Sequence, residues 1–299
     1  MQTTTTTLAS LIDGALFELE APSERGRPLV LSSNFLETTA DTEFSLTVGD
    51  LSVSDLAEFG QELVLVTAKT ADVVPVYTVA RGYYGTTAAV HAAGAVGYAN
   101  PQFARRRVAE AIQRSLTVIE AAGVQLVTSV AYTRVPGKRQ LLLPANTRRV
   151  LQVLYVNSTS GRVLELADWF EYVVPTGNIL MLPTYVVDSD SLVITATVPY
   201  EWTGTFPSEA ATVLLPVGAE DLPSAYAAAW LTTGREVSRQ ELDRAAEWSQ
   251  SVPTQSGSGI GLVRAKWQEF YRSLDEARRV TAFEVPRSRP LVKRPKVRI

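Results

Sequence analysis

Cysteine is absent from the 299 residues, and histidine occurs only at position 91. The chain therefore forms no disulfide bond and offers neither a thiolate metal ligand nor a cysteine nucleophile. A single imidazole excludes a metal site built from several histidines, and a Ser-His-Asp triad would have to use His91. Because no Gly-x-Ser-x-Gly motif occurs, we expect His91 to order a loop by hydrogen bonding, and we expect no enzymatic activity.

Long apolar runs are absent as well. No segment approaches the roughly 18 to 20 uncharged apolar residues of a membrane span. The first ten residues, MQTTTTTLAS, lack the basic and apolar regions of a signal peptide. We therefore expect no membrane contact, and a product that stays in the cytoplasm where it is made or leaves inside a particle. The glycine-rich stretch at 257–261 lacks the strand and lysine of a phosphate-binding loop, so no cofactor is expected.

The composition is that of a globular protein, with 46% hydrophobic and 20% charged residues. A chain of this length normally forms two or three compact units. The net charge of −3 conceals an asymmetry: residues 1–100 hold 4 basic and 12 acidic residues, whereas residues 280–299 hold 6 basic and 1 acidic. Acidic and basic ends indicate complementary surfaces on neighbouring copies, a basic arm that binds an acidic partner, or simply a solvated surface with an irregular charged tail.

The apolar pattern predicts an α+β fold with a helical core from residues 101–122 and 220–280. Asn100 followed by Pro101 is typical of a helix start, with Asn100 as the N-cap. The five threonines near the N-terminus offer no core, so we expect an adaptable or disordered arm there. The predicted units are an N-terminal arm at 1–28, a small β domain at 29–100, a helix at 101–123, an antiparallel β-sandwich-like domain at 124–216, helices at 217–280 and an extended basic arm at 281–299.

Two helices carry side chains that point to contacts. Arginines at 105–107 and 114 oppose the macrodipole at the start of the first helix, which indicates either a partner surface or an exposed face that needs no partner. The segment at 262–279 has apolar residues at intervals of three and four, typical of an amphipathic helix. Its expected interface residues are Trp267, Phe270, Tyr271 and Leu274.

One stretch, RGYYGTTAAVHAAGAVGY at residues 81–98, differs from the rest in composition. It follows β-branched segments that predict strands, and its glycines allow tight turns or the close approach of another backbone. We expect it to form the last strands and a loop of the first β domain. The residues of this motif loop are Arg81, Gly82, Tyr83, Tyr84, Gly85, Thr86, Thr87, His91 and Gly94.

The run from Arg81 to Ala95 resembles a segment that recurs in virion structural proteins of tailed bacteriophages, above all head-to-tail connectors. The resemblance implies an adaptor at the head-to-tail junction of the virion, in a ring commonly of twelve copies. Such a ring docks on the portal protein and extends the DNA channel toward a stopper or tail terminator, with double-stranded DNA passing through without sequence specificity. On this interpretation the C-terminal arm anchors on a neighbouring copy or on the portal through Arg287, Arg289, Lys293, Arg294, Lys296 and Arg298.

Two alternatives stay open. Adaptors of this kind are mainly helical, whereas roughly two thirds of this chain is β-rich by its pattern. The chain is therefore either an adaptor with large β insertions or a baseplate or tail-associated protein that shares only the motif. A polysaccharide-binding or depolymerising tail protein is a more remote alternative, because it needs paired carboxylates beside exposed aromatics. The local candidates are Glu165, Asp168 and Glu171, next to Trp169.

Overall fold

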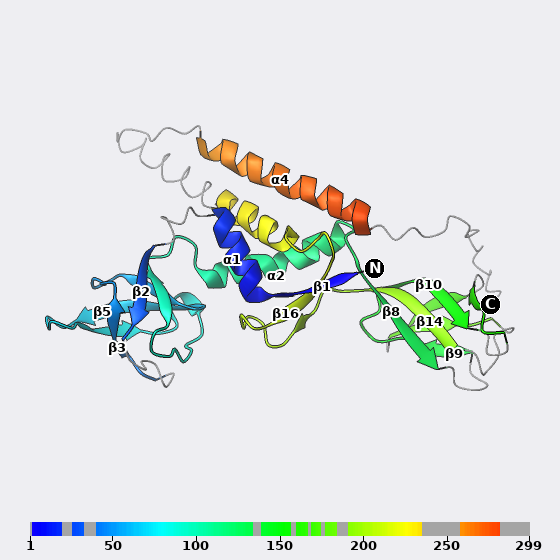
Figure 1. Cartoon of the computed structure of the whole chain (residues 1–299), viewed down its shortest axis with the longest axis horizontal. Helices are drawn as coiled ribbons and strands as arrows, with labels where there is room; N and C mark the ends of the chain where they lie inside the picture. The colour runs from blue at the N-terminus through cyan, green and yellow to red at the C-terminus, as the bar shows by residue number, and fades with distance from the viewer. Residues whose placement is uncertain are drawn as a thin grey trace, which may run out of the picture.

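A computed structural model describes residues 2–19, 26–32, 40–133, 139–156, 160–166, 169–174, 177–183, 191–234 and 258–281. It contains a central group of helices with a small three-stranded sheet, which we call the helical body (Figure 1). A closed β-barrel lies on one side of this body, and a unit of two β-sheets lies on the other. The predicted α+β class is confirmed. No helix in the described part of the chain is both long and apolar enough to span a membrane.

The barrel closes through antiparallel pairing in the order β2-β3-β6-β5-β4-β7. Closure leaves no unpaired strand edge, so the unit resists edge-to-edge association. Its interior is aromatic and aliphatic, with Phe44, Phe59 and Tyr77 buried at its centre. The strands are β2 (Arg27–Leu31), β3 (Glu43–Val48), β4 (Leu56–Phe59), β5 (Glu62–Lys69), β6 (Val76–Ala80) and β7 (Val96–Ala99).

The helical body is assembled from both ends of the chain. One apolar cluster joins the first two helices to the small sheet, and a second joins the end of α2 to the last two helices. Because Ile112 lies in the first cluster and Ile119 in the second, α2 belongs to both cores. The elements are β1 (Thr3–Thr7), α1 (Leu8–Leu19), α2 (Arg105–Ala121), β15 (Trp202–Thr203), β16 (Thr212–Pro216), the helix at 222–234 and α4 (Ser258–Thr281).

The two-sheet unit consists of a four-stranded sheet, β11-β10-β14-β8, and a three-stranded sheet, β12-β13-β9. Val153 and Ile194 of the first sheet and Leu180 of the second share one buried cluster, so the sheets face each other as in a β-sandwich. Its strands are β8 (Leu126–Thr133), β9 (Gln140–Leu142), β10 (Arg149–Val156), β11 (Val163–Glu165), β12 (Phe170–Val174), β13 (Gly177–Met181) and β14 (Ser191–Val198).

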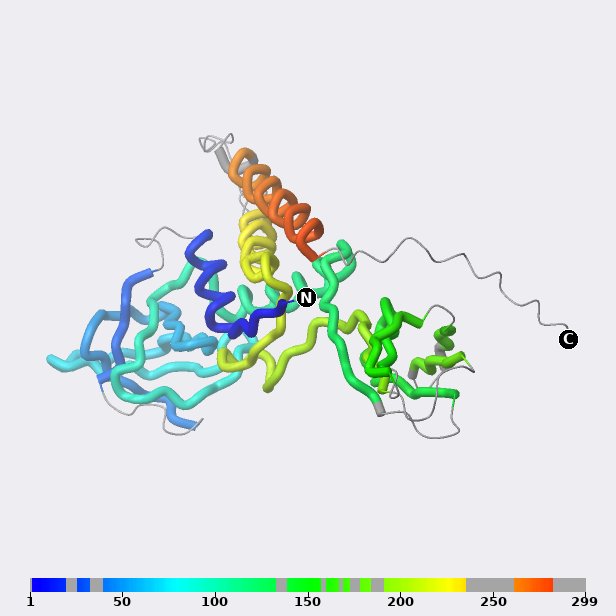
Figure 2. Tube along the Cα trace, turned by 45° about the vertical axis from the view of Figure 1, so that its right-hand side comes forward, coloured from blue at the N-terminus to red at the C-terminus, as the bar shows by residue number. Residues whose placement is uncertain are grey.

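Both β units are insertions between elements of the helical body. The barrel separates α1 from α2 in sequence, and the two-sheet unit separates α2 from β15. Figures 1 and 2 place the two units at opposite sides of the body, which lies between them in both views. Large β content therefore coexists with a continuous helical core, because each insertion leaves and re-enters the body between helices.

The expectation of an adaptable or disordered arm is wrong for the threonine run. Thr3–Thr7 forms β1, which pairs antiparallel with β16, and α1 buries Leu8 and Ile12 in the first core cluster. Threonine is β-branched and favours strands once a partner strand is available. That partner lies more than 200 positions away in the chain, so no local pattern reveals it.

The predicted N-cap at Asn100 is also wrong. Asn100 adopts a φ of 49° and closes the barrel instead: its Oδ1 accepts the Leu56 amide at 2.8 Å, and its Nδ2 donates to Asp55 at 2.9 Å. Helix α2 begins later, at Arg105, with Ala104 before it and no side-chain cap from that residue. A side chain that suits a helix cap is equally able to bind a neighbouring strand.

Candidate functional site

Glu62 organises the motif loop. It stands at the start of β5, directly after the tight connection from β4, and its side chain is completely buried. Arg81 binds the carboxylate in a bidentate manner, with Nε to Oε1 at 2.9 Å and Nη2 to Oε2 at 2.7 Å. Planar pairing of this kind is among the strongest polar contacts in proteins.

Three further donors fill the remaining positions around the same carboxylate. The Ala89 amide donates to Oε2 at 2.9 Å, His91 Nε2 lies 3.0 Å from the same oxygen, and the Gly82 amide lies 3.4 Å from Oε1. Arg81 also donates to the Ala89 carbonyl, which ties the two ends of the loop together. The first half of the motif is therefore a loop wrapped around one buried charge.

The electrostatics match this geometry. Burial acts to raise the pKa of Glu62, but the hydrogen bonds from His91, Arg81 and the Ala89 amide, together with the Arg81 charge, outweigh it and lower the pKa to about 2. The carboxylate therefore stays ionised throughout the physiological range. The surrounding hydrogen-bond donors and the Arg81 charge therefore compensate for the cost of burying this ionised carboxylate. An isolated buried carboxylate would have no such compensation.

The motif glycines serve the tight path of the loop. Gly82 and Gly85 adopt φ values of 63° and 75° on either side of Tyr84, which itself has a φ of 53°. Further along, a Cβ at Gly97 would lie 2.5 Å from the Glu58 carbonyl and from the Phe59 ring. Thr86 fixes the turn, because its hydroxyl accepts the Leu63 amide at 3.0 Å and faces the Tyr83 carbonyl at 3.0 Å.

The outer surface of the motif carries apolar side chains. Tyr84 is 78% exposed, and Val90 and Val96 are about 60% exposed. A cavity of about 480 Å³ lies between Tyr84 and the first turns of α2, where Arg106 and Arg107 line it. The loop thus combines a rigid interior with an exposed aromatic beside cationic side chains, which is a composition suited to protein contacts.

The arginines at the start of α2 are largely used within the chain. Arg105 donates to Asp13 of α1 at 2.7 Å and to Glu209 at 2.8 Å, and Arg106 pairs with Glu110 at 3.0 Å. Burial acts to lower the pKa of Arg105, but its two carboxylate partners raise it overall. The interpretation of these residues as a partner surface is therefore wrong for Arg105, whose task is to join α1, α2 and the segment before β16.

Glu58 of the barrel supplies the missing cap of α2. Its side chain is buried, and Oε1 accepts the backbone amide of Arg105 at 2.7 Å. A carboxylate at this position satisfies a free amide and opposes the positive end of the helix. Gln61 of the barrel also donates to the Pro207 carbonyl of the helical body. The barrel is thus fixed to the body by polar contacts at the edge of the motif region.

The predicted helix interface residues divide into two groups. Phe270 and Leu274 are buried, and together with Trp267 they pack on Tyr226 of the helix at 222–234. Trp267 also donates to the Thr233 hydroxyl at 2.9 Å. Tyr271 is 56% exposed and stacks on Trp267. These side chains build a core within one chain, which leaves Tyr271 as the member of the set on the outer face of α4.

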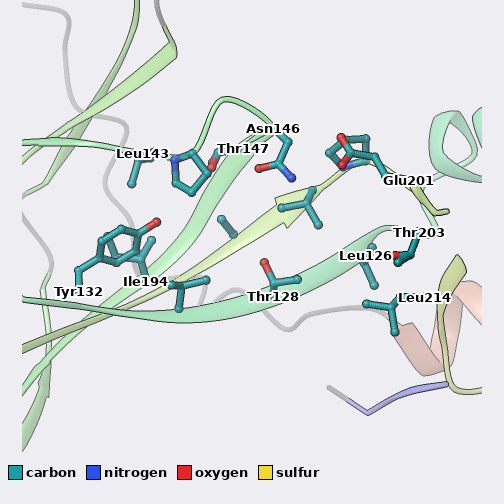
Figure 3. A pocket seen from close by; sticks show the side chains of 15 residues that line it. Leu126, Thr128, Tyr132, Leu143, Asn146, Thr147, Ile194, Glu201, Thr203 and Leu214 are labelled. Carbon is teal, nitrogen blue, oxygen red and sulfur yellow. The ribbon is translucent and has the colours of Figure 1, made fainter. Parts of the chain in front are cut away.

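Of the carboxylates proposed for glycoside chemistry, the two in the described part of the chain lie on different sheets. Glu165 lies on β11 of the four-stranded sheet, whereas Glu171 lies on β12 of the other sheet, where it accepts the Val150 amide and the Asn178 side chain. Asp168 falls outside the described residues. A cavity of about 310 Å³ on the face of β8 and β14 is lined mostly by apolar groups and contains neither Glu165 nor Glu171 (Figure 3).

The basic residues of the C-terminal arm, from Arg287 to Arg298, lie outside the described residues. Glu62 and Glu58, by contrast, were missed by sequence reasoning although they hold the motif in place. A signal was available, because Arg81 and His91 sit among small and apolar residues and a buried cation requires a buried anion.

Comparisons with known proteins give little. No protein-family model and no curated protein matches the sequence. Among solved structures, a chain from the neck of an empty GTA particle computed with C6 symmetry matches with a TM-score of 0.22 and 17% identity. The match covers 42% of this chain and 64% of that chain, which is less than two thirds of its length. A score this low does not establish a shared fold.

Proposed function

We propose that this protein is a virion structural protein, a head-to-tail adaptor whose copies form a ring on the portal and extend the DNA channel toward the tail. The observation that carries the proposal is the helical body with its two β insertions. The resemblance of residues 81–95 implies a mainly helical adaptor. The β-rich sequence pattern argued against a mainly helical adaptor. The two insertions explain this β-rich pattern and leave the helical core continuous.

Further features support a structural role. The motif encloses one ionised carboxylate, and its oxygens accept hydrogen bonds from loop residues. This arrangement fixes the loop and leaves Tyr84 exposed. Acidic residues dominate the first hundred positions and basic residues the last twenty. Opposite charges at the two ends suit head-to-tail contacts between copies in a closed ring.

The ring is tested with the purified protein, alone and mixed with the portal of the same phage, by native mass spectrometry and negative-stain averaging. We expect monomers that assemble into a ring, of twelve copies, only on the portal. A stable trimer or hexamer that forms regardless of the portal would overturn the adaptor assignment and favour a baseplate or tail-associated protein.

Removal of residues 284–299 tests the role of the basic arm in the same assay. The truncated protein should keep the melting temperature of the full chain, because Pro286, Pro290 and Pro295 prevent this basic segment from forming a helix that could join the core. It should fail to assemble on the portal. Normal assembly of the truncated, folded protein would contradict the proposed anchoring by the arm.

A further inference from the structure

A groove in the helical body has no role in the fold or in the motif. Its volume is about 820 Å³, and its walls come from β1, from α1, from the start of the helix at 222–234 and from the middle of α4. Phe17 of α1 stands at its rim and is 74% exposed. An aromatic side chain this exposed beside a large groove is a common mark of a protein contact.

One wall of the groove is an edge strand of the sheet that the described residues form. In the order β1-β16-β15, β1 lies at the edge of the sheet. The Val217 amide donates to the Gln2 carbonyl and the Leu8 amide to the Ala211 carbonyl, so the even-numbered residues of β1 exchange hydrogen bonds with β16. By the alternation of antiparallel pairing, the backbone groups of Thr3 and Thr5 point away from β16. An edge of this kind accepts an added strand.

The groove is also strongly acidic. Glu18, Glu220, Asp221 and Glu269 line it. The base beside them is Lys266, which lies 3.3 Å from Glu18 and 3.7 Å from Glu269. Burial raises the pKa of Glu18, Lys266 lowers it, and the charges of Glu269 and Asp221 raise it further. Four carboxylates therefore lie beside one lysine in this groove, and Glu18 is among those that face it.

We propose that this acidic groove binds the basic C-terminal arm, residues 282–299, of a second copy of the chain. The arm carries six basic residues and one acidic residue, which complements four carboxylates and one lysine. Between Pro290 and Pro295, residues 291–294 keep every backbone N–H, so this stretch is able to add to β1 as a short strand. Leu291 and Val292 in the same stretch offer apolar partners for Phe17.

The course of α4 favours a second copy over the same chain. Glu269 and Ser273 line the groove, and α4 then continues for eight residues to Thr281, roughly 12 Å farther along its axis. Arg278 binds the Ala122 carbonyl at the far end of α2. Helix α4 therefore ends past the groove residues Glu269 and Ser273, and an arm of the same chain would have to reverse direction to enter the groove. This inference rests on the proposed function only for the presence of neighbouring copies.

The test is a titration of full-length protein with a fluorescent peptide of residues 282–299, followed by anisotropy at low ionic strength. We expect saturable binding that weakens as salt is added, because the contact is between opposite charges. Glu269→Lys with Asp221→Lys in the groove should weaken binding at least about tenfold. The matched control, Glu43→Lys with Glu165→Lys on the two β units, makes the same change in net charge and should bind like wild type.

Charge exchange makes the test specific. A peptide with Arg294→Glu and Lys296→Glu should lose affinity for wild type and regain it for the protein with the reversed groove. If that protein melts early, Asp221→Asn with Glu269→Gln provides a milder variant that should still bind the natural peptide more weakly. Equal binding of the natural peptide to wild type and to all folded groove variants would overturn the proposal.

Binding of the arm in the groove of its own chain would give a different result in the peptide titration. A full-length variant with Arg294→Glu and Lys296→Glu in its own arm should bind the natural peptide as wild type does at nanomolar protein concentration. Much tighter binding to this variant would mean that the arm fills its own groove, which would overturn the assignment to a second copy. The titration uses no portal. Peptide binding without ring assembly on the portal would therefore refute the proposed function alone. Ring assembly without peptide binding would refute this inference alone.

Discussion

At the scale of single residues, the motif owes its shape to Glu62. The side chains and amides of four loop residues are arranged around one carboxylate, and Arg81 alone supplies two hydrogen bonds. Because the carboxylate and the guanidinium are both buried, each one is tolerated only in the presence of the other. The residues that stand out in the sequence are therefore the ligands, and the group that they enclose lies outside the motif.

Glu62→Gln should destabilise the protein at neutral pH by about 3 kcal/mol, because it leaves the Arg81 charge buried without a counter-ion. The folded-state pKa of about 2 lies below the ordinary value of 4.5. The contribution of Glu62 to stability is thus fully present above about pH 4.5 and is lost as the pH falls toward 2. Urea unfolding of both proteins at several pH values should show their difference shrinking over this interval.

The control for this prediction is Glu43→Gln, at an exposed position on β3 of the same barrel. Its free energy of unfolding should stay within about 0.5 kcal/mol of wild type. A constant difference between wild type and Glu62→Gln from pH 7 to pH 3 would contradict the assigned role of the ionised carboxylate.

At the scale of elements, α2 connects the parts of the molecule. Its first turn meets the barrel through Glu58 and meets α1 through Arg105 and Asp13. Its last turns meet the helices at 222–234 and α4 through Ile119. Three consecutive arginines at its N-terminus are unfavourable for an isolated helix. Carboxylates from three other elements compensate, so the helix start depends on tertiary contacts.

Glu58→Ala should lower the free energy of unfolding by about 1 to 2 kcal/mol, the usual cost of a lost helix cap. Amide hydrogen exchange should rise in the first turn of α2, where Arg105 loses its acceptor, while exchange at the end of the helix stays as in wild type. Glu58→Gln keeps an acceptor oxygen, so its free energy of unfolding should lie between those of wild type and Glu58→Ala. Unchanged exchange at Arg105 in the alanine variant would show that the cap does not hold the helix start.

At the scale of the whole molecule, the chain divides into a helical body and two β units with separate apolar clusters. The barrel is closed, and its first and last strands pair with each other, Arg27 opposite Ala99. Its ends therefore lie side by side where the chain enters and leaves. An insertion of this type folds as a unit and can vary in size without disturbing its host.

A fragment of residues 26–100 should accordingly fold alone, with a cooperative thermal transition and dispersed amide resonances. Its stability should fall below that of the barrel in the full chain, because the fragment lacks the contacts of Glu58 and Gln61 with the body. A fragment that gives only collapsed, broad spectra would show that the body is needed for the barrel to fold.

The sequence was sufficient for features that depend on neighbouring residues. Period-two and helical patterns gave the α+β class, and the composition of residues 81–98 identified a specialised loop. The same reasoning placed the amphipathic face of α4, since Phe270 and Leu274 recur at helical spacing and are buried. Local propensity failed for Thr3–Thr7 and Asn100, because their hydrogen-bond partners are distant in the chain.

By itself, then, the sequence determined the α+β class, the amphipathic face of α4, where the charges of opposite sign are concentrated and which loop is unusual. Only the tertiary structure decided that Glu62 is the centre of that loop, that Glu58 caps a helix of another unit and that β1 and four carboxylates share a groove. The physical reason is that each of these arrangements needs long-range closure. A buried charge, a helix cap and a strand edge acquire their roles from whichever residues the fold brings beside them.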